Sequence, residues 1–190
     1  MLPKVLQDLL DQIDACEGDA ERLIADLDDA AVNWTPPSGG WSVAQCLTHL
    51  TLMNEFYLRG WPDALADATR TGGGSFRGLH PTPIGRWFIR YLEPPYRMKS
   101  KAIPAATPAA RMPRDTLLRD YKKSHDMYRY LVHGTAVVDA NRVIAPNAIL
   151  KRVTMRLSTV LLIIPAHDRR HLWQASNVNA LRRSLLNRVP

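Results

Sequence analysis

The sequence contains little cysteine, glycine or phenylalanine, and each shortage excludes a class of protein. Its 190 residues include two cysteines, Cys16 and Cys46, which lie far apart and do not form a C-x-x-C pair. This spacing argues against a disulfide framework and favours a reducing compartment, so we expect a cytoplasmic protein. Ten glycines and three phenylalanines argue against a strand-rich sandwich.

The sequence also lacks a long hydrophobic run. The longest nearly continuous apolar run covers residues 160–166, whereas a helix that crosses a bilayer needs about 20 apolar residues. Acidic residues begin at Asp8, and no apolar segment of the kind found in signal peptides precedes it. We therefore expect neither a membrane-spanning helix nor a signal peptide.

Acidic residues are fewer than basic ones. The sequence has 18 Asp and Glu against 25 Lys and Arg, which gives a formal net charge of +7. A basic protein can use this charge for solubility, or to attract an anionic partner such as nucleic acid or an acidic small molecule. The basic residues do not form a tight block with interleaved aromatic residues. Nucleic-acid binding is therefore the less favoured function class.

Apolar residues recur at three- and four-residue steps in four segments, which predicts four amphipathic helices. These helices are expected over residues 3–29, 41–68, 114–133 and from 158 past 178. A Pro- and Gly-rich break separates the first two, and Ser42 with Gln45 predicts a capping box at the start of the second. We predict an all-α four-helix bundle that forms a single domain over residues 1–190.

Two connections in this bundle are long. Residues 71–113 form a Pro-rich, irregular crossover between the second and third helices, with one short helix expected near 85–91. Residues 137–156 form a connector of undetermined structure before the last helix, for which Ser158 is the predicted N-cap. Pro165 falls inside that helix and is expected to kink it, because proline removes one backbone hydrogen bond.

Three histidines are candidate metal ligands. His167 and His171 are four residues apart in the last predicted helix, so both imidazoles lie on one face, one turn apart. Such a pair can bind one divalent metal ion, although the spacing alone is a weak signal. His49 lies among apolar residues of the second predicted helix, where a lone histidine is more often a core residue than a ligand.

These histidines occur in a pattern that resembles a known family. The run from Trp41 and Ser42 to His49, followed late in the chain by the His167–His171 pair, resembles the DinB-like superfamily. That superfamily includes YfiT-type metal-dependent hydrolases and bacterial thiol-dependent transferases. The Pro-rich residues 94–113 also resemble the crossover of this family, so the resemblance covers nearly the whole chain.

The resemblance implies a site and a function. His49, His167 and His171 would bind one divalent ion, with zinc as the default and nickel, iron or manganese as alternatives. Three protein ligands leave a coordination position open, which suits activation of water or of a low-molecular-weight thiol against a small-molecule substrate. The alternative is a non-catalytic, stress-related metal-binding protein. Bundles of this family often pair, so a homodimer is expected.

Several polar residues near these histidines have two interpretations each. Gln45 can reach His49 or serve only as part of the cap, and Gln174 can hold His171 or lie on the surface. Cys46 is more simply a small buried residue than a ligand.

One face of the third predicted helix carries Tyr121, His125 and Tyr128. These residues can line the pocket, with His125 as a proton shuttle, or they can pack in the bundle with polar tips at its rim, which is the favoured interpretation.

The residues between the late histidines are also charged. Asp168 points about 100° away from His167 on a helix, so it is a poor fourth ligand and is expected to pair with an arginine. Arg169 and Arg170 can attract an anionic substrate, although a solvated helix face explains them more simply.

Overall fold

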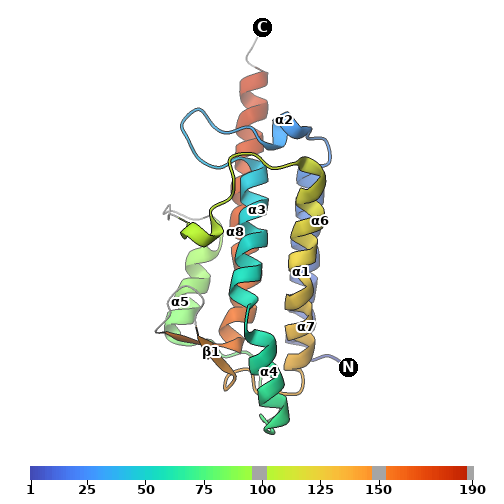
Figure 1. The fold of residues 1–190 in the computed structure, drawn as a ribbon, viewed down its shortest axis with the longest axis vertical. Helices are drawn as coiled ribbons and strands as arrows, with labels where there is room; N and C mark the ends of the chain where they lie inside the picture. The colour runs from blue at the N-terminus through green and yellow to red at the C-terminus, as the bar shows by residue number, and fades with distance from the viewer. Residues whose placement is uncertain (96–101, 147–152, 188–190) are drawn as a thin grey trace.

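The computed structural model describes residues 1–95, 102–146 and 153–187, and it is mostly helical, which confirms the predicted all-α class (Figure 1). Its elements, in chain order, are α1 Lys4–Ile24, α2 Asp29–Val32, α3 Val43–Leu58, α4 Trp61–Arg70, α5 Pro83–Leu92, the 3-10 helix η1 Pro104–Ala106, α6 Arg114–Ser124, α7 Asp126–Thr135, β1 Ile144–Pro146, β2 Thr154–Arg156 and α8 Leu157–Leu186.

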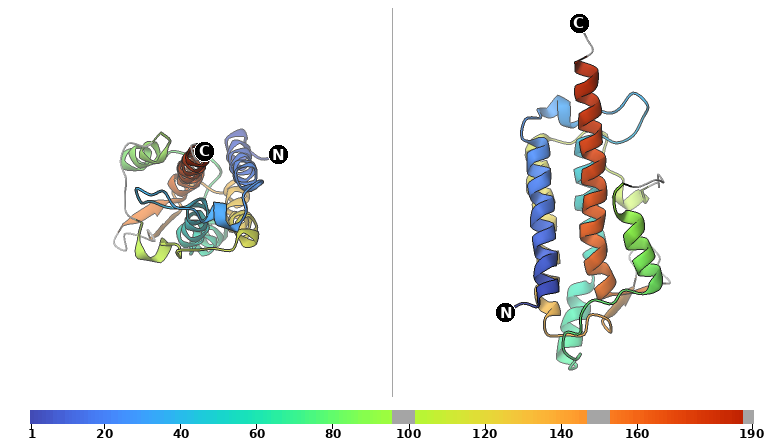
Figure 2. Two further views of the ribbon diagram at one scale, coloured as in Figure 1. Left: turned by 90° about the horizontal axis from the view of Figure 1, so that it is seen from above. Right: turned by 180° about the vertical axis from the view of Figure 1, so that it is seen from behind.

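The long helices run side by side along the length of the molecule. The first helix α1, the third α3, the last α8 and the consecutive pair α6 and α7 follow the long axis, while α4 extends from the end of α3 (Figure 1). Helix α3 packs against both α8 and α6, and α8 also packs against α1 and α5. Figure 2 shows α8 from behind, between α1 on one side and α5 on the other.

Two of the predicted helices are interrupted. The prediction of one helix over residues 41–68 is wrong, because α3 ends at Leu58 and α4 begins at Trp61. Gly60 separates them with φ of 82°, a left-handed conformation that glycine adopts without steric cost. The third predicted helix is divided at His125 into α6 and α7. Periodicity did not reveal either break, since apolar spacing continues across both.

The crossover contains the short helix predicted near 85–91, which is α5, and also the unpredicted 3-10 helix η1. Residues 96–101 of its Pro-rich segment 94–113 lie outside the described part of the chain. The connector contains a short antiparallel pair, β1 and β2, in which Ala145 lies opposite Met155. No alternation of apolar and polar residues marks such three-residue strands.

The predicted N-cap of the last helix at Ser158 is also wrong, because α8 begins one residue earlier, at Leu157, without a side-chain cap.

Helix α8 continues through Pro165 without interruption. Proline has no N–H, so the carbonyl of Leu161, four residues earlier, loses its usual helical donor. The hydroxyl of buried Tyr128 on α7 donates a hydrogen bond to this carbonyl oxygen at 2.7 Å. A tertiary contact therefore replaces the missing helical bond and holds the helix at the turn that precedes the late histidines.

The interior consists of two large apolar clusters stacked along the bundle. One is formed mainly by α1, the end of α3, α4, α7 and the first turns of α8, and includes Tyr128, Leu131 and Leu161. The other is formed by α1, α3, α6 and the later turns of α8, and includes Leu47 and Tyr121. Because α3 and α8 contribute to both clusters, their facing sides are fixed along most of their length.

Candidate metal centre

The capping box at the start of α3 sets the position of the first histidine. The hydroxyl oxygen of Ser42 accepts a hydrogen bond from the backbone N–H of Gln45 at 3.1 Å, and the Gln45 side-chain oxygen accepts one from the N–H of Ser42 at 3.0 Å. The helix therefore begins at a defined residue, and His49 follows about two turns later on the side that faces α8. Trp41, just before the cap, packs against His49 with ring centroids 4.7 Å apart.

The structure brings the three predicted histidines together. His49 on α3 and His167 and His171 on α8 each place a ring nitrogen within 4.8 Å of the others, and all three residues are buried. The ring centroids lie 5.3 Å apart for His49 and His167, 4.6 Å for His49 and His171, and 4.7 Å for His167 and His171. We call these residues the three-histidine cluster.

Hydrogen bonds orient two of these imidazoles. His49 Nδ1 lies 2.7 Å from the carbonyl oxygen of Ala106, and His171 Nδ1 lies 3.0 Å from the side-chain oxygen of Gln174. Since these oxygens accept hydrogen bonds, each Nδ1 carries the proton and each Nε2 keeps a lone pair. Among the described residues, the buried Nδ1 of His167 has no partner. A donor set of this kind fits a divalent cation.

The cluster is electrostatically neutral at physiological pH. Burial lowers the pKa of all three imidazoles, and their proximity lowers it further in His167 and His171. The pKa of His171 falls to about 3, against an ordinary value near 6.5. Because an imidazole must be unprotonated to bind a metal ion, the same burial prepares the cluster for that role.

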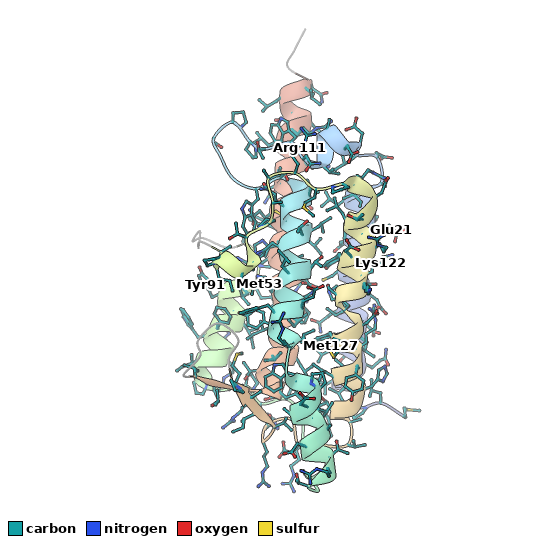
Figure 3. All side chains as sticks on the ribbon, in the orientation of Figure 1. Glu21, Met53, Tyr91, Arg111, Lys122 and Met127 are labelled. Carbon is teal, nitrogen blue, oxygen red and sulfur yellow. The ribbon has the colours of Figure 1, made fainter. Side chains whose placement is uncertain are left out.

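A cavity of about 580 Å³ opens onto the three-histidine cluster, a size suited to a small molecule. Its wall is mostly apolar and aromatic; Tyr91 on α5 and Met53 on α3, both labelled in Figure 3, are part of it. Polar groups on the same wall come from Arg170, Gln174 and Asn177. A larger cavity of about 720 Å³ lies between α3 and α6 and includes none of these histidines.

The structure decides between the alternatives for the neighbours of the cluster. Gln45 belongs to the cap and also donates to the carbonyl of Ala109, so it does not hold His49. Cys46 is a buried core residue whose thiol pKa is raised by burial, and it does not line the cavity. Gln174 holds His171 by the hydrogen bond described above.

A second cluster, in which His125 and Asp168 are fully buried, lies on another side of α8. Asp168 Oδ2 accepts hydrogen bonds from His125 Nε2 at 2.8 Å and from the Tyr121 hydroxyl at 3.1 Å. His125 Nδ1 in turn lies 2.8 Å from Glu17 on α1, and Glu17 also pairs with Arg129 at 3.0 Å. We call Glu17, His125 and Asp168 the ionic cluster.

The ionic cluster corrects two predictions. Asp168 was expected to pair with an arginine, but it binds His125 and Tyr121, since it points from α8 into the buried interior of the bundle. The residues Tyr121, His125 and Tyr128 pack inside the bundle, as favoured, but their polar groups are buried rather than placed at its rim. His125 does not line the cavity of the three-histidine cluster and therefore is not placed as a proton shuttle.

The two arginines between the late histidines have different positions. Arg169 forms an ion pair with Glu93, whose Oε2 lies 3.0 Å from its Nε, and it also binds Gln12. Arg170 is 4% exposed and lines the cavity, so a solvated helix face does not describe it. The sequence did not identify Tyr91 or the carbonyl of Ala106 as parts of the site, because both come from the irregular crossover, which has no local signal for its tertiary position.

The fold and the site define a class of protein: a helical protein with a buried three-histidine cluster in the wall of a small-molecule-sized cavity. Residues 12–175 match the family model of the DinB superfamily, so the chain belongs to that superfamily. The comparisons found no match among curated proteins or solved structures. Among the described residues, no helix has the length and apolar character needed to cross a membrane.

Proposed function

We propose that His49, His167 and His171 bind one divalent metal ion and that this site activates a small nucleophile. The observation that carries the proposal is the convergence of three buried imidazoles, whose ring nitrogens lie within 4.8 Å of one another, in the wall of a cavity. Zinc is the default metal for three imidazoles, with nickel, iron and manganese as alternatives.

The nucleophile is a low-molecular-weight thiol, in an S-transferase, or water, in a hydrolase. When bound, the ion would lower the pKa of that thiol or water and so supply a nucleophile near neutral pH. The chain itself orients the imidazoles through the Ala106 carbonyl and Gln174. Aromatic and aliphatic side chains of the cavity wall exclude water from the substrate, which is the contribution of the surrounding pocket.

The alternative is a non-catalytic metal-binding protein, which requires no substrate cavity. The 580 Å³ cavity beside the three-histidine cluster favours the enzyme over this alternative. The family resemblance further supports a cytoplasmic homodimer with a small-molecule substrate. Light scattering coupled to size-exclusion chromatography tests the dimer, with a monomeric mass as the contrary result.

Metal content tests the site directly. Elemental mass spectrometry of purified protein reloaded with zinc should give close to one ion per chain in the wild type. His167→Ala and His171→Ala should each lose most of this metal, because two imidazoles bind far more weakly than three. His133→Ala is the matched control, since this exposed histidine on α7 lies outside the cluster.

Two results would contradict the proposal. The first is a wild type that takes up none of zinc, nickel, iron or manganese, and the second is retention of metal by both cluster variants. Circular dichroism of each variant checks that the helices are intact. If metal is bound, thiols and ester substrates are assayed against the reloaded protein, and activity that requires His171 but not His133 separates the enzyme from the non-catalytic alternative.

A further inference from the structure

Tyr57 differs from the other buried tyrosines in how its hydroxyl is used. The hydroxyl of Tyr121 donates a hydrogen bond to Asp168, and that of Tyr128 donates one to the carbonyl oxygen of Leu161. Tyr57, near the end of α3, is 5% exposed, yet its hydroxyl has no hydrogen-bond partner among the described residues. A buried phenol usually finds a partner, because an unsatisfied hydroxyl costs free energy. The Tyr57 hydroxyl is therefore available to a ligand.

The cavity that contains the three-histidine cluster also contains Tyr57 in its wall. The Tyr57 ring belongs to the apolar cluster formed by α1, the end of α3, α4, α7 and α8. Apolar side chains offer no hydrogen-bond acceptor, so the packed side of the ring cannot satisfy the hydroxyl. The cavity is the place where an acceptor can reach it.

Tyr57 and the three-histidine cluster are connected by one face of α3. His49, Met53 and Tyr57 follow each other at four-residue steps, and all three line the cavity. Eight residues of helix rise about 12 Å, and helical side chains tilt towards the N-terminus, so the Tyr57 ring leans back over the turn that contains Met53. A molecule that fills part of the 580 Å³ cavity can therefore touch both the histidines and Tyr57.

The Tyr57 hydroxyl is a hydrogen-bond donor at neutral pH. Burial raises its pKa to about 12, against an ordinary value near 10, so the group keeps its proton. A neutral phenol in an apolar wall favours an oxygen acceptor on the ligand.

We propose that the Tyr57 hydroxyl donates a hydrogen bond to a carbonyl oxygen of the substrate, so that the cavity selects apolar molecules that carry a ketone, ester or amide group. The apolar part would contact the wall that includes Phe88 and Leu92. The proposal rests on and deepens the proposed function, since it names the substrate class of the same cavity. Tyr57 is a specificity-determining residue in this scheme, and its hydrogen bond does not require the metal.

A matched pair of probes tests this inference by NMR titration. The probes are benzylacetone and its methylene analogue, in which a CH₂ group replaces the carbonyl oxygen without much change of shape. Binding is followed through the methyl signal of Met53, which lies in the cavity wall (Figure 3), in protein labelled at its methionine methyl groups. Chelator-treated, metal-free protein is used first, so that no ion can bind the ketone, and zinc-loaded protein is titrated in parallel.

The substitution Tyr57→Phe removes the hydroxyl and keeps the ring. It should weaken benzylacetone binding by about three- to tenfold, the value of one neutral hydrogen bond, and change the affinity for the methylene analogue by less than about twofold. Tyr128→Phe is the matched control, because it removes a hydroxyl from a buried tyrosine outside the cavity wall. This control should leave the affinity for both probes unchanged.

Urea unfolding of the same two variants provides a second readout. Tyr128→Phe should lower the unfolding midpoint, because it breaks the hydrogen bond to Leu161. Tyr57→Phe should not lower it, because no hydrogen bond within the described protein is lost. An equal decrease in both variants would mean that the Tyr57 hydroxyl is satisfied inside the protein, and would overturn the proposal.

The binding data can overturn the proposal independently. Contrary results are an unchanged ketone affinity in Tyr57→Phe, equal losses for both probes, or no shift of the Met53 signal by either probe at millimolar concentration. Failure of the metal site is a separate result. If zinc does not bind but the ketone affinity depends on the Tyr57 hydroxyl, the carbonyl-binding site stands and the proposed metal-dependent function fails.

Discussion

The three-histidine cluster and the ionic cluster lie on different sides of the same helix. His167 and Asp168 are adjacent on α8, and a step of one residue turns the side chain by about 100°. His167 therefore faces the cavity together with His49 and His171, whereas Asp168 faces His125 in the interior. Both clusters contain buried imidazoles.

The imidazoles of the two clusters have opposite ionisation states. Burial alone disfavours the charged form of every histidine. In the three-histidine cluster, the neighbours are other imidazoles, a carbonyl, an amide and the Arg170 guanidinium, so the pKa stays low. Burial also acts on His125, but the charges and hydrogen bonds of Asp168 and Glu17 outweigh it and raise the pKa to about 9. The partner, rather than the degree of burial, decides which histidine is a ligand and which is a cation.

The largest effect is expected from removal of the Asp168 charge. Asp168→Asn should reduce the free energy of unfolding of metal-free protein by about 3–5 kcal/mol, because it leaves the His125 cation buried with one fewer counter-charge. Urea unfolding measures the loss. The same substitution at exposed Asp120, which pairs with Arg119 on the surface, should cost less than about 1 kcal/mol.

The Asp168 variant also tests whether the clusters are independent. If they are, folded Asp168→Asn should still bind close to one zinc ion per chain. Loss of zinc from a folded variant would show that Asp168 positions His167, and a stability loss as small as that of Asp120→Asn would show that the ionic cluster contributes little.

A smaller effect is expected from the pH dependence of stability. Because the pKa of His125 rises from 6.5 to about 9 on folding, the native state binds more protons than the unfolded state between these values. The stability due to His125 should therefore be complete below pH 6.5 and lost as the pH rises towards 9. The His125 imidazole is in contact with three ionisable groups, which are Glu17 from α1, Tyr121 from α6 and Asp168 from α8.

The measurement compares urea unfolding of wild type and His125→Asn from pH 6 to 10, in about half-unit steps. The difference between the two free energies should shrink as the pH increases. A difference that stays constant, or that grows with pH, would mean that His125 is neutral in the folded protein.

The smallest effect is expected when one candidate metal ligand, His171, loses the hydrogen bond that orients its ring. Gln174→Ala removes the oxygen that accepts a hydrogen bond from His171 Nδ1, and loss of such a group usually weakens metal binding by about 10–100-fold. A competition titration with a chromogenic chelator measures zinc affinity. Asn177→Ala removes another amide from the same cavity wall and should leave the affinity close to that of wild type. Equal losses in the two variants would assign the effect to the cavity as a whole.

Much of the local structure follows from short-range patterns. The Ser42–Gln45 capping box, the long apolar faces and the placement of His167 and His171 on one helix face depend on residues within a few positions of each other. The division at Gly60 was not predicted, since the apolar spacing continues through this residue. The strands β1 and β2 were not predicted either, because three residues are too few to show an alternation of apolar and polar side chains. His49 required the family pattern, because nothing near it distinguishes a ligand from a core histidine.

The sequence by itself determined the helical class, the start of α3 and the shared face of His167 and His171, since these depend on backbone geometry and neighbouring side chains. Only the tertiary structure decided which partners met across 30 residues or more. It placed His125 beside Asp168, Tyr128 beside the carbonyl left open by Pro165, and Arg170 rather than Arg169 on the cavity wall. Ionisation and hydrogen bonding of buried groups depend on atoms within a few ångströms in space, and distance along the chain does not reveal these neighbours.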